Sequence, residues 1–167
     1  ELFQDAPAEG ATLLVANVSR YAVDLNRAED DVDAGVVSGH PNPARPFARG
    51  LIWRTTADDE PALERPLSRD EYHGRLEALY RPYHAALRAA LERKIARFGH
   101  AILLCGHSMP SFGRTGHADA HVPRADVVPG SRGRTSAHPL VIDTVEAIAR
   151  GAGCTVEHDR PYRGGFS

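Results

Sequence analysis

Apolar residues recur at steps of three and four along one long segment, which predicts the clearest helix of the chain. The stripe runs from Leu76 to Phe98, and this spacing places side chains on one face of a helix. The segment Ser68 to Glu71 has the form of a capping box, in which the Ser and Glu side chains bind free backbone N–H groups of the first turn. Gly99 suits the end of the helix. Pro82 lacks a backbone donor and predicts a kink or two abutting helices.

Shorter runs rich in β-favouring residues and bounded by turn residues predict strands. They are 11–18, 51–55, 101–105, 125–128 and 154–157. The fully apolar run at 101–105 suits a buried central strand. A second helix is predicted over 136–152, with one apolar stripe of Val141, Val145, Ile148 and Ala152. This order of elements predicts an α/β fold, with helices packed on a mixed central sheet in a three-layer α/β/α arrangement.

Length and composition add modest limits. The 167 residues fit one domain, and contents of 42% apolar and 25% charged residues are ordinary for a globular protein. A net charge of −2 gives no reason to expect nucleic acid or an anionic membrane as a partner. The chain has no apolar run long enough to span a bilayer and no export signal at its N-terminus. We expect a cytoplasmic protein with Cys105 and Cys154 as reduced, buried thiols, and a single bridge between their strands is the alternative.

Two loops that follow predicted strands carry candidate chemistry. The loop from Ser19 to Arg27 offers two arginines and an asparagine, which can present planar donors to a carboxylate. The alternative is a solvated loop in which Asp24 pairs with one arginine. His107 follows the run at 101–105 on a glycine turn, so it is a candidate metal ligand or general base, or a structural histidine. Ser108 is an unsuitable nucleophile, because a proline replaces the second glycine of a G-x-S-x-G elbow.

Three further segments are less specific. The glycines and arginines of 125–136 precede the second predicted helix and could hold an anion, or could simply cap that helix. The loop 161–166 follows the last predicted strand. His117, Asp119 and His121 have an H-x-D-x-H spacing that could bind a metal, although a solvated loop is the simpler interpretation.

Taken in order, these segments resemble the N-formylglutamate amidohydrolase family. Residues 19–27 resemble its S-R-x-x-x-D-x-N-R segment, and the match continues through Asp30-Asp31. Pro82-Tyr83-His84 matches a trio in its long helix. His107-Ser108-Met109-Pro110 resembles its H-S-M-P loop, 126–136 its D-x-x-x-G-x-R-x-x-x-S stretch, and 161–165 its P-Y-K/R-G-G loop. The resemblance covers nearly the whole chain, and the combination is specific although no single motif is.

The family is similar in fold and metal chemistry to the zinc carboxypeptidases and aspartoacylases, within a phosphorylase/hydrolase-like fold. The resemblance implies that Asn26 and Arg27 hold the carboxylate of the substrate, that Arg20 faces the polarised amide carbonyl, and that His107 binds one zinc ion. Arg132 and Arg163 are further expected to bind substrate. The implied reaction is hydrolysis of N-formyl-L-glutamate, or a similar N-acyl acidic amino acid, to L-glutamate and formate, in which zinc activates water.

Two parts of the family pattern are missing. An early P-H-S-G-like metal-binding loop and a late Q-x-E-like strand with a catalytic glutamate have no match, so we expect a longer protein that supplies the other zinc ligands. An acid often stands two residues before the metal-binding histidine, and here that residue is Cys105. Two alternatives stay open. One is hydrolysis of a γ-glutamyl or cell-wall peptide bond, in a larger pocket lined by 41–53. The other is a metal-free protein that binds acidic ligands. The sequence does not indicate an oligomeric state.

Overall fold

The computed structural model describes residues 3–46 and 49–164. The chain divides into two compact units. The first comprises 1–56, 61–107 and residue 167, and the second comprises 57–60 and 108–166. Each unit is described by itself below, and the expected single domain stays a prediction.

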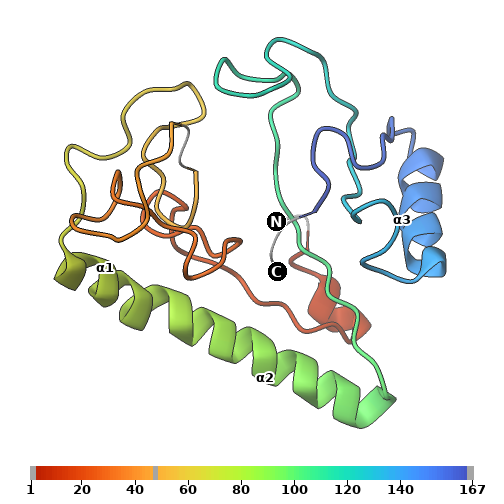
Figure 1. Ribbon diagram of the computed structural model, residues 1–167. Helices are drawn as coiled ribbons and strands as arrows, with labels where there is room; N and C mark the ends of the chain where they lie inside the picture. Colours follow the sequence, from red (N-terminus) through yellow and green to blue (C-terminus); the bar gives the residue numbers. More distant parts are fainter. Residues whose placement is uncertain (1–2, 47–48, 165–167) are drawn as a thin grey trace. The chain divides into compact units, whose positions relative to one another are not determined.

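The long predicted helix is confirmed in the first unit. It consists of α1 (Arg69–Arg75), the π-helical segment η2 (Leu76–Tyr80) and α2 (Arg81–Phe98), which form one continuous rod in Figure 1. Ser68 caps α1 with the predicted capping box: its side chain accepts from the Glu71 N–H, and the Glu71 carboxylate accepts from the Ser68 N–H. Gly99 ends α2 with a φ of 76°, a conformation that glycine adopts without steric cost.

A wide turn replaces the kink expected at Pro82. The Arg81 N–H donates to the Leu76 carbonyl, five residues back, so the turn before Pro82 is π-helical. Pro82 lies in the first turn of α2, where a missing N–H is tolerated. A short 3₁₀ helix, η1 (Ala6–Glu9), lies near the start of the chain.

The core of the first unit comes mostly from irregular backbone between residues 19 and 67, a region in which the sequence predicted only the short strand at 51–55. Its valines, leucines and isoleucine pack against one face of α1 and η2. The buried side chains are Val23, Val32, Val36, Val37, Leu51, Ile52, Leu67, Tyr72, Leu76 and Tyr80. At Gly50, a Cβ atom would lie 2.1 Å from the Asp31 carbonyl oxygen, so only glycine permits this close backbone approach.

A buried carboxylate organises part of this irregular region. Asp33 is fully buried; it accepts from the Gly35 N–H at 2.8 Å and forms an ion pair with Arg45 at 3.1 Å. Burial alone would raise the pKa of Asp33, but the hydrogen bonds from Arg45 and Gly35 outweigh it and lower the pKa. The charged form is therefore favoured, and it closes the loop between residues 33 and 45.

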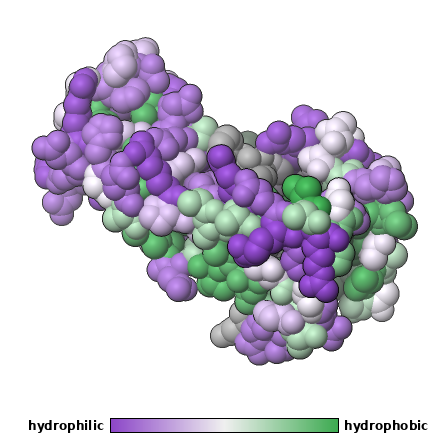
Figure 2. Space-filling view, turned by 90° about the horizontal axis from the view of Figure 1, so that it is seen from below, coloured by the Kyte–Doolittle hydropathy of each residue, from purple (hydrophilic) through white to green (hydrophobic). Residues whose placement is uncertain are grey.

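The predicted strands are not formed in the part of the chain that the structure describes. Backbone pairing there is limited to isolated bridges, including a parallel one between Val127 and Val156 that joins two of the predicted strand runs. The three-layer α/β/α arrangement is therefore not confirmed. The run at 101–105 was predicted to be buried, but Ile102, Leu103 and Leu104 are 61%, 41% and 59% exposed. Figure 2 shows hydrophobic surface in green on one face of the molecule.

The prediction for the cysteines was correct in one respect and wrong in another. Both thiols are free, as expected for reduced cysteines. Cys105 is exposed because the run that carries it is exposed, whereas Cys154 is partly buried. None of the described helices is long and apolar enough to cross a membrane.

The second predicted helix is confirmed as α3 (Pro139–Gly151) in the second unit, with the His138 side chain accepting from the Leu140 N–H at its start. The predicted stripe is wrong in part, because Ile148 is 68% exposed, and Ile142 and Glu146 are the buried positions. Glu146 is buried because it joins a polar network described below.

We predict that Ser68→Ala lowers the free energy of unfolding of the protein by about 1 kcal/mol, the usual cost of losing an N-cap side chain. Urea unfolding monitored by circular dichroism measures this. Ser38 is an exposed serine of the same unit and gives the control Ser38→Ala, for which we expect a change within about 0.5 kcal/mol. Equal effects of the two substitutions would contradict a role for the capping box.

Candidate active site

Asp24 is the centre of the polar cluster formed by the first loop. It is only 2% exposed, yet its carboxylate accepts from the Asn26 backbone N–H at 3.1 Å and from the Trp53 indole N–H at 2.9 Å. Two guanidinium groups also face it, Arg20 at 3.4 Å and Arg27 at 3.9 Å. Their side chains are 48% and 45% exposed. Each arginine is therefore attached to a buried anion on one side and open to solvent on the other.

Trp53 fixes the position of this carboxylate and of Arg20. The Arg20 guanidinium lies over the indole ring, 4.8 Å from its centroid, and Arg49 lies 5.6 Å from the same centroid. Tyr21 meets the ring edge-on at 5.6 Å. Such cation–π contacts favour a charged group held flat on the ring. The loop and the segment at 51–55 are further joined by the Asp24 N–H, which donates to the Leu51 carbonyl at 2.8 Å.

His107 lies beside this cluster. Its Nε2 atom is 3.3 Å from the side-chain amide nitrogen of Asn26, across 81 residues of sequence. The residue has exposed surface, but the neighbouring protein removes enough water from the ring to lower its pKa, and the positive charge of Arg20 acts in the same direction. Asp24 partly opposes this shift. A lowered pKa favours neutral imidazole, the form that binds metals or accepts a proton.

Four of the predicted site residues therefore lie in one cluster of the first unit: Arg20, Asn26, Arg27 and His107. The other two, Arg132 and Arg163, lie in the second unit, where they are joined through the backbone. The Arg132 N–H donates to the Arg163 carbonyl at 2.8 Å. A Cβ atom at Gly130 would lie 2.6 Å from the Gly164 nitrogen, so both loops need glycine to pack this closely.

The loop that carries Arg132 has a left-handed backbone. Arg132, Gly133 and Arg134 have φ values of 54°, 72° and 65°, a conformation that costs energy for residues other than glycine. The Asp159 carboxylate holds the turn by accepting from the Ser131 N–H at 2.6 Å and from the Gly133 N–H. Burial would raise the pKa of Asp159, but these backbone donors lower it.

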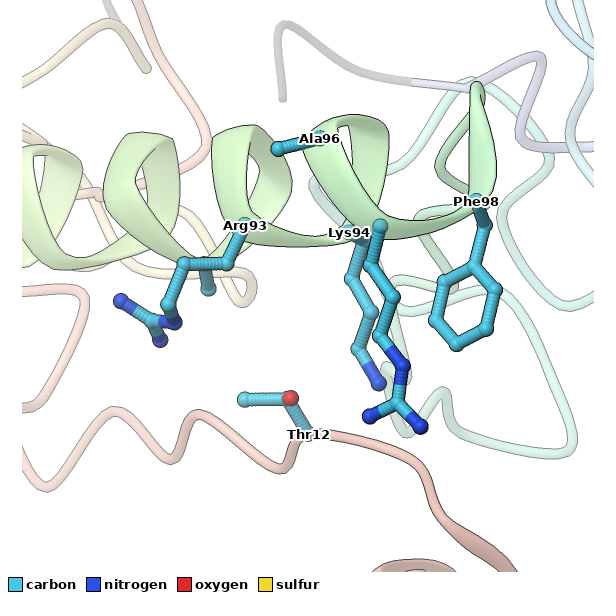
Figure 3. Close-up of a pocket in the computed structure, with 7 residues that line it drawn as sticks. Thr12, Arg93, Lys94, Ala96 and Phe98 are labelled. Carbon is cyan, nitrogen blue, oxygen red and sulfur yellow. The ribbon is translucent and has the colours of Figure 1, made fainter.

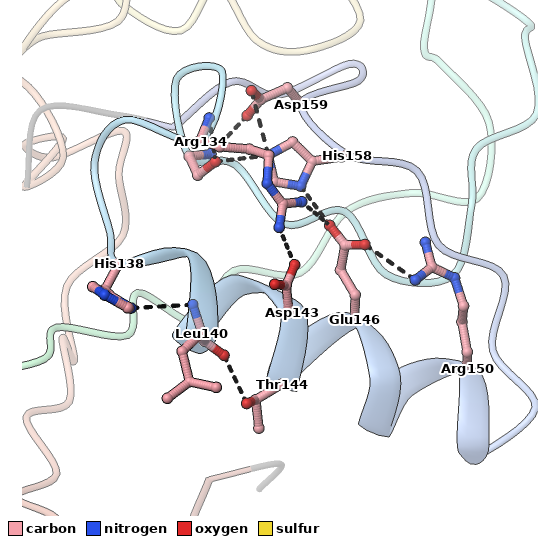
Figure 4. A network of polar contacts seen from close by, with 10 residues as sticks. Arg134, His138, Leu140, Asp143, Thr144, Glu146, Arg150, His158 and Asp159 are labelled. Carbon is pink, nitrogen blue, oxygen red and sulfur yellow. Dashed lines mark hydrogen bonds and ion pairs between the residues drawn. The ribbon is translucent and has the colours of Figure 1, made fainter.

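A second network braces the same turn against α3 (Figure 4). Ser131 Oγ lies 2.6 Å from His158 Nε2, and His158 Nδ1 lies 2.7 Å from the Glu146 carboxylate. The hydrogen bond from His158 lowers the pKa of Glu146, which also binds Arg134 and Arg150. This order of groups resembles a serine, histidine and acid relay, but Ser131 is only 4% exposed and its Oγ accepts from the Arg134 N–H. Its role is to hold the turn.

The comparisons with known proteins agree on one family. The model of the N-formylglutamate amidohydrolase family matches residues 1–167. The chain is 32% identical over 159 residues, 90% of its length, to the N-formylglutamate deformylase of Pseudomonas aeruginosa, and 35% identical over 115 residues, 66% of its length, to that of Pseudomonas putida.

This chain belongs to the N-formylglutamate amidohydrolase family. A solved structure, the N-formylglutamate amidohydrolase from Ralstonia eutropha JMP134, superposes with a TM-score of 0.85 over 98% of the chain at 38% identity. The chain spans 53% and 39% of the length of the two Pseudomonas relatives and 60% of the solved chain.

The described residues do not form a metal centre by themselves. Among residues 3–46 and 49–164, no three or more His, Cys, Asp or Glu residues gather as metal ligands. A zinc site in an enzyme needs about three protein ligands, so His107 by itself does not fit a complete site. The H-x-D-x-H alternative is not supported: Asp119 forms a bidentate pair with Arg124 at 2.7 and 2.8 Å, and His117 also bonds Arg124.

The cavity in Figure 3 is not the predicted site. It measures about 580 Å³ and is lined by Thr12 and by residues near the end of α2, among them Arg93, Lys94 and Arg97. None of the six predicted site residues lines it. Lys94 reaches across to donate to the Gly10 carbonyl at 2.9 Å, so part of this positive charge ties the first residues of the chain to α2.

Sequence reasoning missed the contribution of Trp53. The residue was noted only as a possible pocket wall, whereas its indole N–H binds Asp24. A tryptophan within a short apolar run gives no sign of a polar partner 29 residues earlier. The pairing of Asp24 with arginine was foreseen as the simpler interpretation of the loop. In the structure, Arg20 and Arg27 both pair with Asp24 and still expose part of their side chains to solvent.

We predict that Asp24→Asn destabilises the protein by about 1–3 kcal/mol, because the buried indole and guanidinium donors lose a charged acceptor. Chemical denaturation of the variant measures the loss. The matched control is Glu64→Gln, an exposed carboxylate of the same unit, for which we expect a change of at most about 0.5 kcal/mol. A stability of Asp24→Asn equal to that of the control would show that the carboxylate does not organise the cluster.

Proposed function

We propose that the protein of which this chain is a part hydrolyses N-formyl-L-glutamate, or a similar N-acyl acidic amino acid, to L-glutamate and formate. Family membership and the names of the relatives support this proposal. The observation that carries it for this chain is the contact between Asn26 and His107 beside Arg20 and Arg27. An imidazole and a set of anion-binding donors are therefore adjacent, as an amidohydrolase for acidic substrates requires.

Each residue has a proposed role that its contacts allow. Arg27 and Asn26 would bind the substrate carboxylate through planar donors, and the exposed half of the Arg27 side chain leaves room for a two-bond contact. Arg20, held on Trp53, would face the amide carbonyl and stabilise negative charge on its oxygen. Arg132 and Arg163 would add positive charge for the acidic substrate. The ion pairs with Asp24 would keep both arginines of the first loop in position before substrate arrives.

Zinc dependence is part of the proposal. His107 would supply one ligand, and the remaining ligands and a catalytic glutamate would come from sequence outside these 167 residues. Bound zinc would supply a polarising charge and an activated water. The donor chemistry of neutral His107 is compatible with this role.

We also propose that the three-layer α/β/α arrangement applies to the complete protein. The runs at 11–18 and 101–105 are apolar and form no strand here, and most of their residues are exposed to solvent. Strands become stable when neighbours satisfy their backbone groups and cover their faces. A crystal structure of the complete protein in which either run lies outside a sheet would overturn this assignment.

We predict that Arg27→Ala in the complete enzyme raises the KM for N-formyl-L-glutamate by about tenfold to a hundredfold, through loss of charge-assisted hydrogen bonds. Steady-state kinetics with Arg88→Ala as control, an exposed arginine on α2, measures this. An unchanged KM would remove the carboxylate-binding role.

The same assay with γ-glutamyl dipeptides tests the proposed substrate. Faster turnover of those dipeptides than of N-formyl-L-glutamate by the unmodified enzyme would favour the alternative, in which the enzyme hydrolyses a γ-glutamyl bond.

We predict stoichiometric zinc uptake by the complete protein. We expect His107→Ala to weaken zinc affinity by at least about tenfold, because even the loss of a group that only hydrogen-bonds to a metal ligand weakens affinity by this much. Isothermal titration calorimetry measures both. His100→Ala, at an exposed histidine in the same unit, serves as the control. Retained binding of an acidic ligand without zinc uptake would instead favour the metal-free binding protein.

A further inference from the structure

The long helical rod holds the candidate active-site loop by its backbone carbonyls. Within residues 22–29, four carbonyl oxygens are bonded by side chains of the rod. The pairs are Arg75 Nη1 to Ala22 at 2.7 Å, His84 Nε2 to Leu25 at 3.0 Å, Tyr80 OH to Arg27 at 2.8 Å, and Tyr72 OH to Glu29 at 2.8 Å. We call these four side chains the carbonyl clamp. They come from α1, η2 and α2 and reach one irregular segment.

Burial explains why the clamp matters to the loop. Tyr72 and Tyr80 are 8% and 5% exposed, and their hydrogen bonds to the Glu29 and Arg27 carbonyls are partly buried. A shielded carbonyl of irregular backbone has no ladder partner, and leaving it without one is costly. Burial also raises the pKa of both phenols, which keeps their hydroxyl protons available for donation.

The π-helical turn brings the clamp onto one face. Tyr72, Leu76, Tyr80 and His84 are spaced by four residues, and each such step overshoots one turn of an ordinary α-helix by about 40°. Hydrogen bonds that close over five residues widen the turn and reduce this drift. The η2 segment lies between Arg75 and Arg81, inside the series. Tyr72 and His84 can therefore both reach the same loop, and Leu76 packs between them in the core.

Two members of the clamp flank the anion-binding residues. His84 binds the Leu25 carbonyl, which is part of the peptide group between Leu25 and Asn26. Tyr80 binds the carbonyl of Arg27 itself. The Asn26 N–H is meanwhile bound by the Asp24 carboxylate. The peptide groups on both sides of Asn26 and Arg27 are therefore fixed from outside the loop. The directions of the two side chains follow from those planes.

We infer that Tyr80 and His84 are positioning residues for substrate recognition: they fix the backbone of Asn26 and Arg27 and thereby aim the donors that bind the side-chain carboxylate of the substrate. This inference rests on the proposed function for the identity of the substrate. Neither residue contacts the reacting amide. Their loss weakens discrimination for the carboxylate and leaves the bond-breaking step largely intact.

The test uses Tyr80→Phe in the complete enzyme with two substrates, N-formyl-L-glutamate and N-formyl-L-norvaline, which lacks the side-chain carboxylate. Loss of one hydrogen bond is expected to raise the KM for N-formyl-L-glutamate by about threefold to tenfold. The kcat for this substrate, and the KM for the norvaline compound, should change less than twofold. A general structural defect would affect both substrates alike, and that result would overturn the inference.

Matched variants keep the result specific. Tyr83→Phe removes the hydroxyl of the neighbouring tyrosine on α2, which makes no hydrogen bond within the described part of the chain, and should leave both KM values unchanged. His84→Ala should reproduce the Tyr80→Phe effect. His84→Gln, which retains a donor, should restore recognition at least in part; failure of this rescue together with a normal Tyr80→Phe enzyme would refute the clamp.

A second measurement does not depend on turnover. Hydrogen exchange of the peptide that spans residues 19–30 should be about threefold to tenfold faster in Tyr80→Phe than in Tyr83→Phe, because the loop opens more often. Unchanged exchange would overturn the clamp even if the enzyme were active. An unmodified enzyme that does not cleave N-formyl-L-glutamate, combined with faster exchange in Tyr80→Phe, would instead remove the proposed function and leave the clamp in place.

Discussion

The buried carboxylate of Asp24 is the constraint on which the candidate active site depends. A charge that is 2% exposed requires compensation, and the indole of Trp53, a backbone N–H and two arginines provide it. Because the arginines approach from the solvent side, they satisfy the carboxylate and still expose donors. One buried anion thus determines where two positive charges stand before any ligand binds.

The first unit builds its core from backbone without regular ladders, which creates a second demand. Carbonyls of irregular backbone need hydrogen-bond donors from elsewhere. For four of those in residues 22–29, the helical rod supplies side-chain donors, whereas a sheet would use main-chain N–H groups. Its tyrosines therefore serve the core and the loop together: the rings of Tyr72 and Tyr80 are in the hydrophobic cluster, and their hydroxyls hold carbonyls. Stability and site geometry depend on the same side chains.

Local patterns in the sequence were sufficient for the helices and for the family. The capping box at Ser68, the end at Gly99 and the helix after His138 depend on neighbouring residues and were predicted closely. The site residues of the first loop were predicted to act together, and Asn26 does meet His107. The core was not predicted, because Val32, Val36 and Val37 lie in a stretch that is rich in Asp, Asn, Gly and Pro and has little periodicity. Their burial depends on long-range anchors such as Asp33 with Arg45.

The exposed runs show the converse limit of local reasoning. Residues 101–105 have the composition of a central strand. Such a composition favours a strand only where other strands pair with the segment and side chains pack against its faces. In this chain, Ile102 and Leu104 are exposed, and the segment meets the first loop just beyond the run, where His107 contacts Asn26. Since the loop is fixed at Asp24 and clamped by the helical rod, the His107 contact is made against a rigid partner. The imidazole therefore lies against the polar anchors of the first loop, which include Trp53 from the predicted run at 51–55.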